Sequence, residues 1–150
     1  MLNIRTGASL LAMGLGLSLL ACDKSASSAD GNNSEAPRAA IKTLGVAQLE
    51  QMLAQSEKPV VYDANSVETR AEYGVIPGAK LLSSSRDFNV DTELPDNKQA
   101  PLVFYCGSTR CQAAEGAADK AVLAGYSDVG VMRDGIKGWA KAGKPTSRLN

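Results

Sequence analysis

A cysteine at the end of an apolar run is the residue of this chain best placed to do chemistry. Cys106 directly follows the run PLVFY (101–105) and opens the segment CGSTRC (106–111), after which the sequence is rich in alanine. The pattern predicts a buried strand that ends at Cys106 and turns at once into a helix. The backbone N–H groups of such a turn, together with the helix N-terminus, favour the thiolate form of a cysteine. We therefore expect Cys106 to be a nucleophile.

The residues that follow Cys106 carry groups that bind small anions. Arg110 supplies a guanidinium group, and Ser108 and Thr109 supply hydroxyl groups that would hold an anion beside the sulfur. The structural alternative is that Cys106 is a small apolar residue packed at a strand end. The glycine, hydroxyl and arginine residues that follow it favour the chemical interpretation.

The composition narrows this chemistry further. The chain has no histidine, which excludes a Ser-His-Asp triad, a Cys-His dyad and any histidine-based zinc site. A nucleophile must then be activated by backbone dipoles and cations. Lys and Arg together number 16, as do Asp and Glu, and they are spread evenly, so no nucleic-acid partner is indicated. The length suits one domain with one core.

The first 39 residues have the pattern of a targeting segment and a tether. Arg5 precedes an apolar stretch over 8–20, which is shorter than the roughly 18 residues of a membrane-spanning helix. Small residues then lead to Cys22, as at the cleavage site of a secretory signal. The motif LLAC resembles the lipobox of bacterial lipoproteins, so we expect a signal peptide over 1–21 and lipid attachment at Cys22. The polar stretch up to residue 39 is expected to be a flexible tether.

Strand and helix patterns alternate through the rest of the chain. Short apolar runs predict strands, and apolar residues at helical spacing predict helices. An N-cap followed by a glutamate three residues later, Asn65 to Glu68, predicts one helix start. Strands are expected at 41–44, 59–63, 79–82, 102–105 and 129–132, helices at 46–56, 65–73, 110–124 and 136–142, and a polar segment with one helical turn at 83–97. This order predicts a single α/β domain over 40–147 with a mainly parallel sheet flanked by helices, and ligands bound beyond the strands' carboxyl ends.

Four segments, taken in order, resemble a rhodanese domain of the sulfurtransferase superfamily. They are VVYD (60–63), GVIPGA (74–79), FYC (104–106) and GIKGW with AGKP (135–145). The resemblance implies that Cys106 accepts sulfur as a persulfide. It also implies that the loop wraps around the bound sulfur and contacts the substrate through Gly107, Ser108, Thr109, Arg110 and Cys111. By the same resemblance Asp63 and Trp139 match positions that are structural.

Together these features predict a membrane-tethered sulfurtransferase or sulfane-sulfur carrier. The resemblance implies a small sulfur-containing anion, thiosulfate or polysulfide, as donor and a thiol as acceptor. No cofactor is expected, and the acids between Asp87 and Asp96 lack the spacing of a calcium loop, so no metal is expected either. The lipid anchor would place the domain in the bacterial cell envelope, on the periplasmic side, at the inner or the outer membrane.

Departures from the family pattern keep two other functions open. Gly107 stands where many active relatives have an arginine, which is compatible with a non-catalytic binding module of the same fold. Cys106 and Cys111 would alternatively serve a thiol–disulfide redox protein. Cys111 itself has two interpretations: a small residue packed in the first turn of the helix, or a thiol that resolves a Cys106 persulfide or forms a disulfide with Cys106. A phosphatase is disfavoured, because Gln112 occupies the position where such enzymes place an arginine.

Overall fold

The computed structural model describes residues 40–149, and in this part strands and helices alternate along the chain. The elements are β1 (Lys42–Leu44), α1 (Val46–Leu53), β2 (Val60–Asp63), α2 (Val67–Tyr73), β3 (Lys80–Leu81), α3 (Val90–Glu93), β4 (Leu102–Tyr105), α4 (Ala113–Leu123), β5 (Val129–Met132) and α5 (Gly135–Lys141). No helix within this range is long and apolar enough to cross a bilayer. The predicted signal peptide, Cys22 and the tether lie outside the described residues.

The strands form one five-stranded sheet in the order β1-β5-β4-β2-β3, with every neighbouring pair parallel. Strand β4 is central, and Phe104 stands in register with Tyr62 of β2 and Val131 of β5. The predicted α/β class and the mainly parallel sheet are confirmed. Because all strands run the same way, their carboxyl ends meet at one edge, and Cys106 directly follows the middle one.

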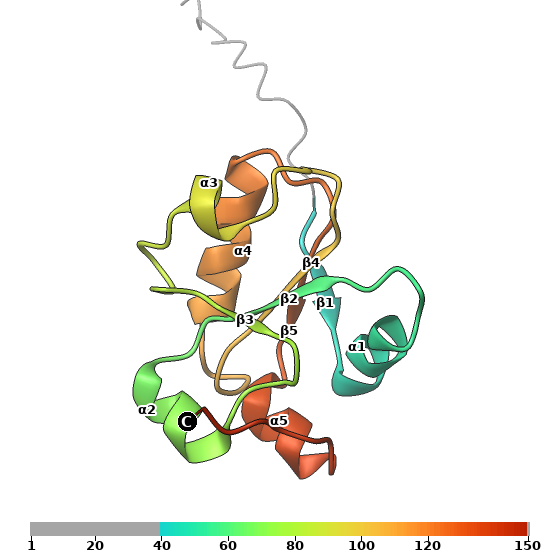
Figure 1. The fold of residues 1–150 in the computed structure, drawn as a ribbon, viewed down its shortest axis with the longest axis vertical. Coiled ribbons are helices and arrows are strands. Elements are labelled where there is room, and N and C mark those ends of the chain that lie inside the picture. The colour runs from blue at the N-terminus through green and yellow to red at the C-terminus, as the bar shows by residue number, and fades with distance from the viewer. Residues whose placement is uncertain (1–39, 150) are drawn as a thin grey trace, which may run out of the picture. The chain divides into compact units, whose positions relative to one another are not determined.

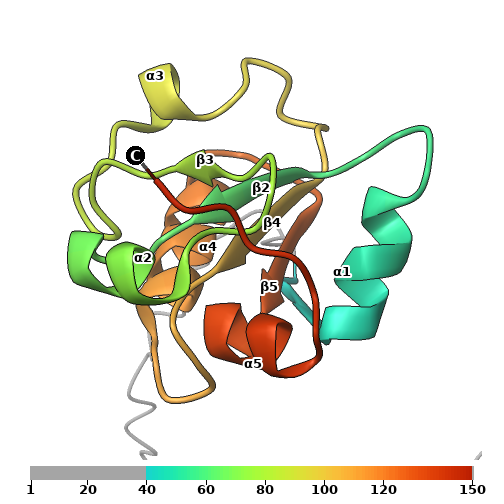
Figure 2. The same ribbon diagram turned by 60° about the horizontal axis from the view of Figure 1, so that its bottom comes forward.

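Helices cover both faces of the sheet. In Figure 1, α3 and α4 lie to one side of the strands and α1 to the other, and the rotated view of Figure 2 shows α5 on the same side as α1. Residues of β4 alternate between the two cores, as the period of a strand requires. Leu102, Phe104 and Cys106 belong to the core under α4, whereas Val103 and Tyr105 belong to the core under α1 and α5.

Several element boundaries differ from the predicted ones, and the structure gives a physical reason for three of them. Helix α4 begins at Ala113, because the preceding residues form a closed loop in which the Cys111 N–H donates to the Ser108 carbonyl at 2.9 Å. Helix α1 ends at Leu53, since the exposed residues after it have no core to contact and the chain must extend before Pro59. The cap of α2 is Ser66, one residue later than predicted, with its hydroxyl accepting from the Thr69 N–H.

Candidate active site

Cys106 lies at the carboxyl end of the central strand, where the sequence predicts it. Its exposed fraction is only 3%, and it packs in the core between the sheet and α4. The loop over 107–112 then connects β4 to α4. Gly107 and Ser108 are half-buried, and Thr109 and Arg110 are exposed. The loop residues predicted to contact the substrate thus lie directly beside Cys106, at or near the surface.

The first turn of α5 holds the carbonyl groups of the cysteine loop. The N–H of Ile136 donates to the Cys106 carbonyl at 2.8 Å, and the N–H of Lys137 donates to the Gly107 carbonyl at 3.1 Å. The N–H groups of residues 107–110 donate to no other group within residues 40–149. A loop whose carbonyls are bound on one side and whose N–H groups are free is suited to hold an anion.

Gly135 makes this arrangement possible. Its φ is +64°, and a Cβ added there would lie 2.6 Å from the carbonyl oxygen of Cys106 and from backbone atoms of Gly107 and Ser108. A side chain cannot fit in that space, and a positive φ also favours glycine. Thus the glycine that begins α5 lets the last helix approach the cysteine loop closely.

Cys106 and Cys111 are joined as a disulfide across the loop, with their Cα atoms 6.3 Å apart, a spacing that suits such a bond. Cys111 lies in the loop, two residues before α4, so of its two interpretations the one that packs it in the first turn of the helix is wrong. Cys111 is half-buried, whereas Cys106 is almost fully enclosed. Of the two sulfur-bearing residues, Cys111 is the more accessible to solvent.

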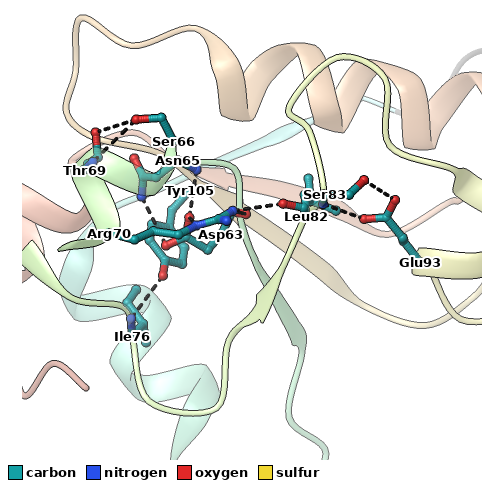
Figure 3. Close-up of polar contacts among 10 residues, drawn as sticks. All are labelled: Asp63, Asn65, Ser66, Thr69, Arg70, Ile76, Leu82, Ser83, Glu93 and Tyr105. Atoms are coloured by element: carbon teal, nitrogen blue, oxygen red, sulfur yellow. Dashed lines mark hydrogen bonds and ion pairs between the residues drawn. The ribbon is translucent and has the colours of Figure 1, made fainter. Parts of the chain in front are cut away.

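A buried polar cluster supports the neighbouring strand end (Figure 3). The carboxylate of Asp63 is fully buried and accepts from Arg70 Nε at 2.9 Å and from the Asn65 N–H at 2.7 Å. Arg70 Nη2 also donates to the carbonyls of Asp63 and Leu82 at 2.9 and 3.0 Å. These bonds tie the end of β2 to α2 and β3. The structural role predicted for Asp63 follows from these contacts, but Arg70 was not predicted as its partner.

Tyr105 links this polar cluster to the core under α1 and α5. Its hydroxyl oxygen accepts from the Ile76 N–H at 3.0 Å. Burial, and then the negative charge of Asp63, raises the pKa of Tyr105 well above its ordinary value. The phenol therefore stays protonated at any physiological pH. It anchors the segment before β3 and has no role as a base.

Glu93 fastens the segment after β3 to α3. Its carboxylate accepts from the hydroxyl and N–H of Ser83 at 2.6 and 2.8 Å and from the Asn89 N–H at 2.9 Å (the Ser83 contacts are drawn in Figure 3). Burial acts to raise the pKa of Glu93, but these hydrogen bonds and the charge of Lys120 outweigh it, and the pKa lies below its usual value. Burial also raises the pKa of Tyr62, whose hydroxyl donates to the Glu93 carbonyl, to about 12.

A cleft of about 510 Å³ opens on the Cys111 side of the loop. Its lining includes Cys111, Arg110 and Gln112 from the loop, Ser85 and Arg86 from the segment after β3, and Gly116 from α4. Arg86 and Ser85 were missed by the sequence analysis. The serine-rich run that ends at Arg86 follows a predicted strand, and the rule that strand ends meet at one edge would have placed it here.

The segment that carries Arg86 is held by its backbone. Lys120 of α4 donates to the carbonyls of Arg86 at 3.1 Å and Phe88 at 2.6 Å, and its ammonium lies 4.6 Å from the centre of the Phe88 ring. The hydroxyl of Ser84 accepts from the Arg86 N–H at 3.2 Å. Arg86 thus extends from a fixed backbone. Within residues 40–149 no cluster of side chains is arranged to hold a metal ion.

Comparison with known proteins places these features in one family. The model of the rhodanese-like domain matches residues 45–142, which is well over half of the chain. No curated protein matches the chain. Among solved structures, a protein from Bacillus halodurans shares 24% identity at a TM-score of 0.60, over 71% of this chain and 77% of that one.

Two further structures share the fold. A thiosulfate sulfurtransferase from Pseudomonas aeruginosa is 19% identical with a TM-score of 0.57, over 73% of this chain and 21% of that one. A protein from Rhodopseudomonas palustris described as a possible tyrosine phosphatase is 22% identical with a TM-score of 0.57, over 71% of this chain and 85% of that one. At these identities the likeness shows the fold alone.

Proposed function

This chain belongs to the rhodanese-like family, and on that premise we propose that it is a sulfurtransferase that carries sulfane sulfur as a persulfide on Cys106. The observation that carries the proposal is the position of Cys106 at the end of the central strand, before a loop in which the N–H groups of residues 107–110 have no partner among the described residues. Backbone N–H groups and the guanidinium of Arg110 would stabilise the thiolate and the anionic persulfide without an imidazole base.

The transfer takes two displacement steps. The Cys106 thiolate attacks the outer sulfur of thiosulfate, the S–S bond of thiosulfate breaks, and sulfite leaves with the electron pair. A thiolate acceptor then attacks the terminal sulfur of the Cys106 persulfide, and Cys106 leaves as a thiolate. The enzyme is unchanged at the end, and the acceptor has become a persulfide. The first step requires reduced Cys106, because a disulfide sulfur is no nucleophile, and the second step regenerates the Cys106 thiolate.

Intact mass measurement tests this proposal directly. The protein is reduced, freed of reductant and incubated with thiosulfate. We expect a gain of one sulfur atom that is lost on adding a thiol. The variant Cys106→Ser should gain none, whereas Cys111→Ser should still gain one. Absence of a sulfur adduct on the reduced wild-type chain with both thiosulfate and polysulfide would leave a binding module as the better account.

The Cys106–Cys111 disulfide favours thiol–disulfide exchange as a second candidate function. A redox protein would transfer this disulfide to a reduced substrate protein and would need both cysteines. Loss of two hydrogens on mild oxidation, together with oxidation of a reduced test protein, supports that alternative. Phosphatase activity has less support, since Gln112 lacks the planar cationic fork that binds phosphate.

The proposed location is the bacterial cell envelope, with the domain held at the membrane by lipid on Cys22. The motif LLAC and the apolar stretch before it support this, and both lie outside the described residues. Cys22→Ser, expressed in a host that processes lipoproteins, should move the protein from the membrane fraction to the soluble fraction. Retention of this variant in the membrane would point instead to an uncleaved apolar anchor.

A further inference from the structure

The cleft beside Cys111 has the properties of a site for a small anionic molecule. Its volume of about 510 Å³ is typical of small-molecule sites. Two guanidinium groups line it, from Arg86 and Arg110, and neither forms an ion pair with another residue in the range 40–149. Glu115, the acid in the first turn of α4, is engaged by Arg133 at 3.1 Å. The residues that line the cleft therefore carry two positive charges and no negative one.

The sulfur-bearing residue that lines this cleft is Cys111. Cys106 does not line it and is 3% exposed, while Cys111 is half-buried. A thiol that enters the cleft therefore meets the Cys111 side of the disulfide first. Exchange depends on which sulfur is accessible and on how stable the leaving thiolate is. Attack at Cys111 releases Cys106, the residue whose surroundings favour the thiolate.

We propose that the Arg86–Arg110 cleft binds a small thiol that carries carboxylate or sulfonate groups, and that this thiol reduces the Cys106–Cys111 disulfide by attacking Cys111. Guanidinium groups bind such anions through paired hydrogen bonds. Arg86 is a positioning residue in this step, because it binds the anionic group and does not touch the reacting sulfurs. The inference rests on the proposed function in one respect, which is that the product is the reduced Cys106 needed for sulfur transfer.

The reaction balances over two thiols. The first thiolate forms a bond to the Cys111 sulfur, the Cys106–Cys111 bond breaks, and the electron pair leaves on Cys106 as a thiolate. The second thiolate attacks the sulfur of the bound thiol in this mixed disulfide, and Cys111 leaves as a thiolate. Two thiols are oxidised to one disulfide, and the protein disulfide is reduced by two electrons.

Reduction kinetics test the proposed site. The oxidised protein is treated with mercaptosuccinate, a dicarboxylate thiol, or with 2-mercaptoethanol, a neutral one, and free protein thiols are measured with time. Each rate is divided by the rate of the same thiol with a neutral small disulfide, which removes differences in intrinsic reactivity. We expect mercaptosuccinate to be favoured by about tenfold or more at low salt, as one or two charge-assisted hydrogen bonds allow. Added salt should reduce the preference.

Variants of Arg86, an exposed arginine of the cleft, test whether the cleft causes the preference for mercaptosuccinate. Arg86→Gln should abolish most of the preference for mercaptosuccinate, and Arg86→Glu should reverse it. Arg148→Gln is the matched control, because Arg148 is also exposed but does not line the cleft. An equal preference in the wild type and Arg86→Gln would overturn the proposal. So would failure of the oxidised protein to contain a Cys106–Cys111 disulfide.

The site of attack is measured separately. The reaction is quenched with acid after a short time, free thiols are blocked with N-ethylmaleimide, and the protein is digested with trypsin. Trypsin cleaves after Arg110, so Cys106 and Cys111 fall on different peptides. We expect the mercaptosuccinate adduct on the Cys111 peptide, and an adduct mainly on the Cys106 peptide contradicts the proposal. Sulfur loading of pre-reduced protein tests the proposed function independently, so the two can fail separately.

Discussion

Gly135 lies against the backbone of Cys106 so closely that a methyl group on its α-carbon would be 2.6 Å from the Cys106 carbonyl oxygen. This approach lets the neighbouring N–H of Ile136 donate to that carbonyl at 2.8 Å. The loop that follows Cys106 is therefore shaped by the last helix of the domain as well as by its own sequence.

Gly135→Ala is expected to lower the free energy of unfolding by at least about 2 kcal/mol, because it combines a steric clash with an unfavourable φ. Gly143→Ala is the matched control: its φ is +71°, close to the +64° of Gly135, but a Cβ there meets nothing within 4 Å. Urea unfolding of both variants separates the clash from the backbone effect. Equal losses in the two variants would show that the contact with Cys106 contributes nothing.

Arg70→Met should destabilise the domain by about 3–5 kcal/mol, since it leaves the carboxylate of Asp63 buried without its cationic partner. The double variant Asp63→Asn with Arg70→Met should lose less than the sum of the two single changes, because no charge is then left in the core. Urea unfolding of the wild type, the two single variants and the double variant gives the coupling free energy between Asp63 and Arg70. If the stability losses of the two single variants simply add, the ion pair at 2.9 Å contributes nothing to stability.

Acid should weaken the attachment of α3. The folded-state pKa of Glu93 lies below its usual value of 4.5, so the folded chain binds fewer protons there than the unfolded chain. The stabilisation is complete above pH 4.5 and is lost as pH falls through the lower folded value. In urea unfolding, the difference in free energy of unfolding between the wild type and Glu93→Gln should therefore become smaller below pH 4.5. A difference that stays constant down to pH 3 would contradict this.

Arg110→Ala should slow sulfur loading from thiosulfate by about 10- to 100-fold, as expected for loss of a charge-assisted hydrogen bond worth about 1.5–3 kcal/mol. Its unfolding midpoint should hardly change, because the side chain is exposed. Arg110→Lys should recover part of the rate, since it keeps the charge but loses the planar fork. A stability loss with an unchanged loading rate would assign Arg110 to the structure of the loop.

Lys120→Met should loosen the segment that carries Arg86 while keeping the methylene contacts to Phe88. The two carbonyls that Lys120 binds, at 3.1 and 2.6 Å, lose their donor. We expect faster amide hydrogen exchange across residues 84–89 and a smaller preference for mercaptosuccinate in disulfide reduction. Lys141→Met, at an exposed position at the end of α5, is the control. Unchanged exchange in this segment would mean that Ser84 alone holds it.

The fold was predictable because the strands are apolar runs bounded by proline, glycine and polar residues, and Cys106 follows the clearest of them. The start of α4 was not predictable, because the alanine-rich pattern does not indicate the turn that the hydrogen bond between Cys111 and Ser108 closes. Contacts between distant segments were also out of reach. Arg70 donates to the carbonyl of Leu82, and Lys120 donates to the carbonyl of Arg86. No local sequence pattern shows which distant carbonyl such a cation will bind.

The bonds from Ile136 and Lys137 to the cysteine loop also set an order of events for a newly made chain. Synthesis proceeds from the N-terminus, so Cys106 emerges before α4, β5 and the start of α5 exist. Until Gly135 and its neighbours have been made, the loop carbonyls lack the donors they have in the finished domain. During that interval the loop also lacks the packing of α4 against Cys106. The surroundings that Cys106 has in the finished domain therefore arise only when almost the whole domain has been translated.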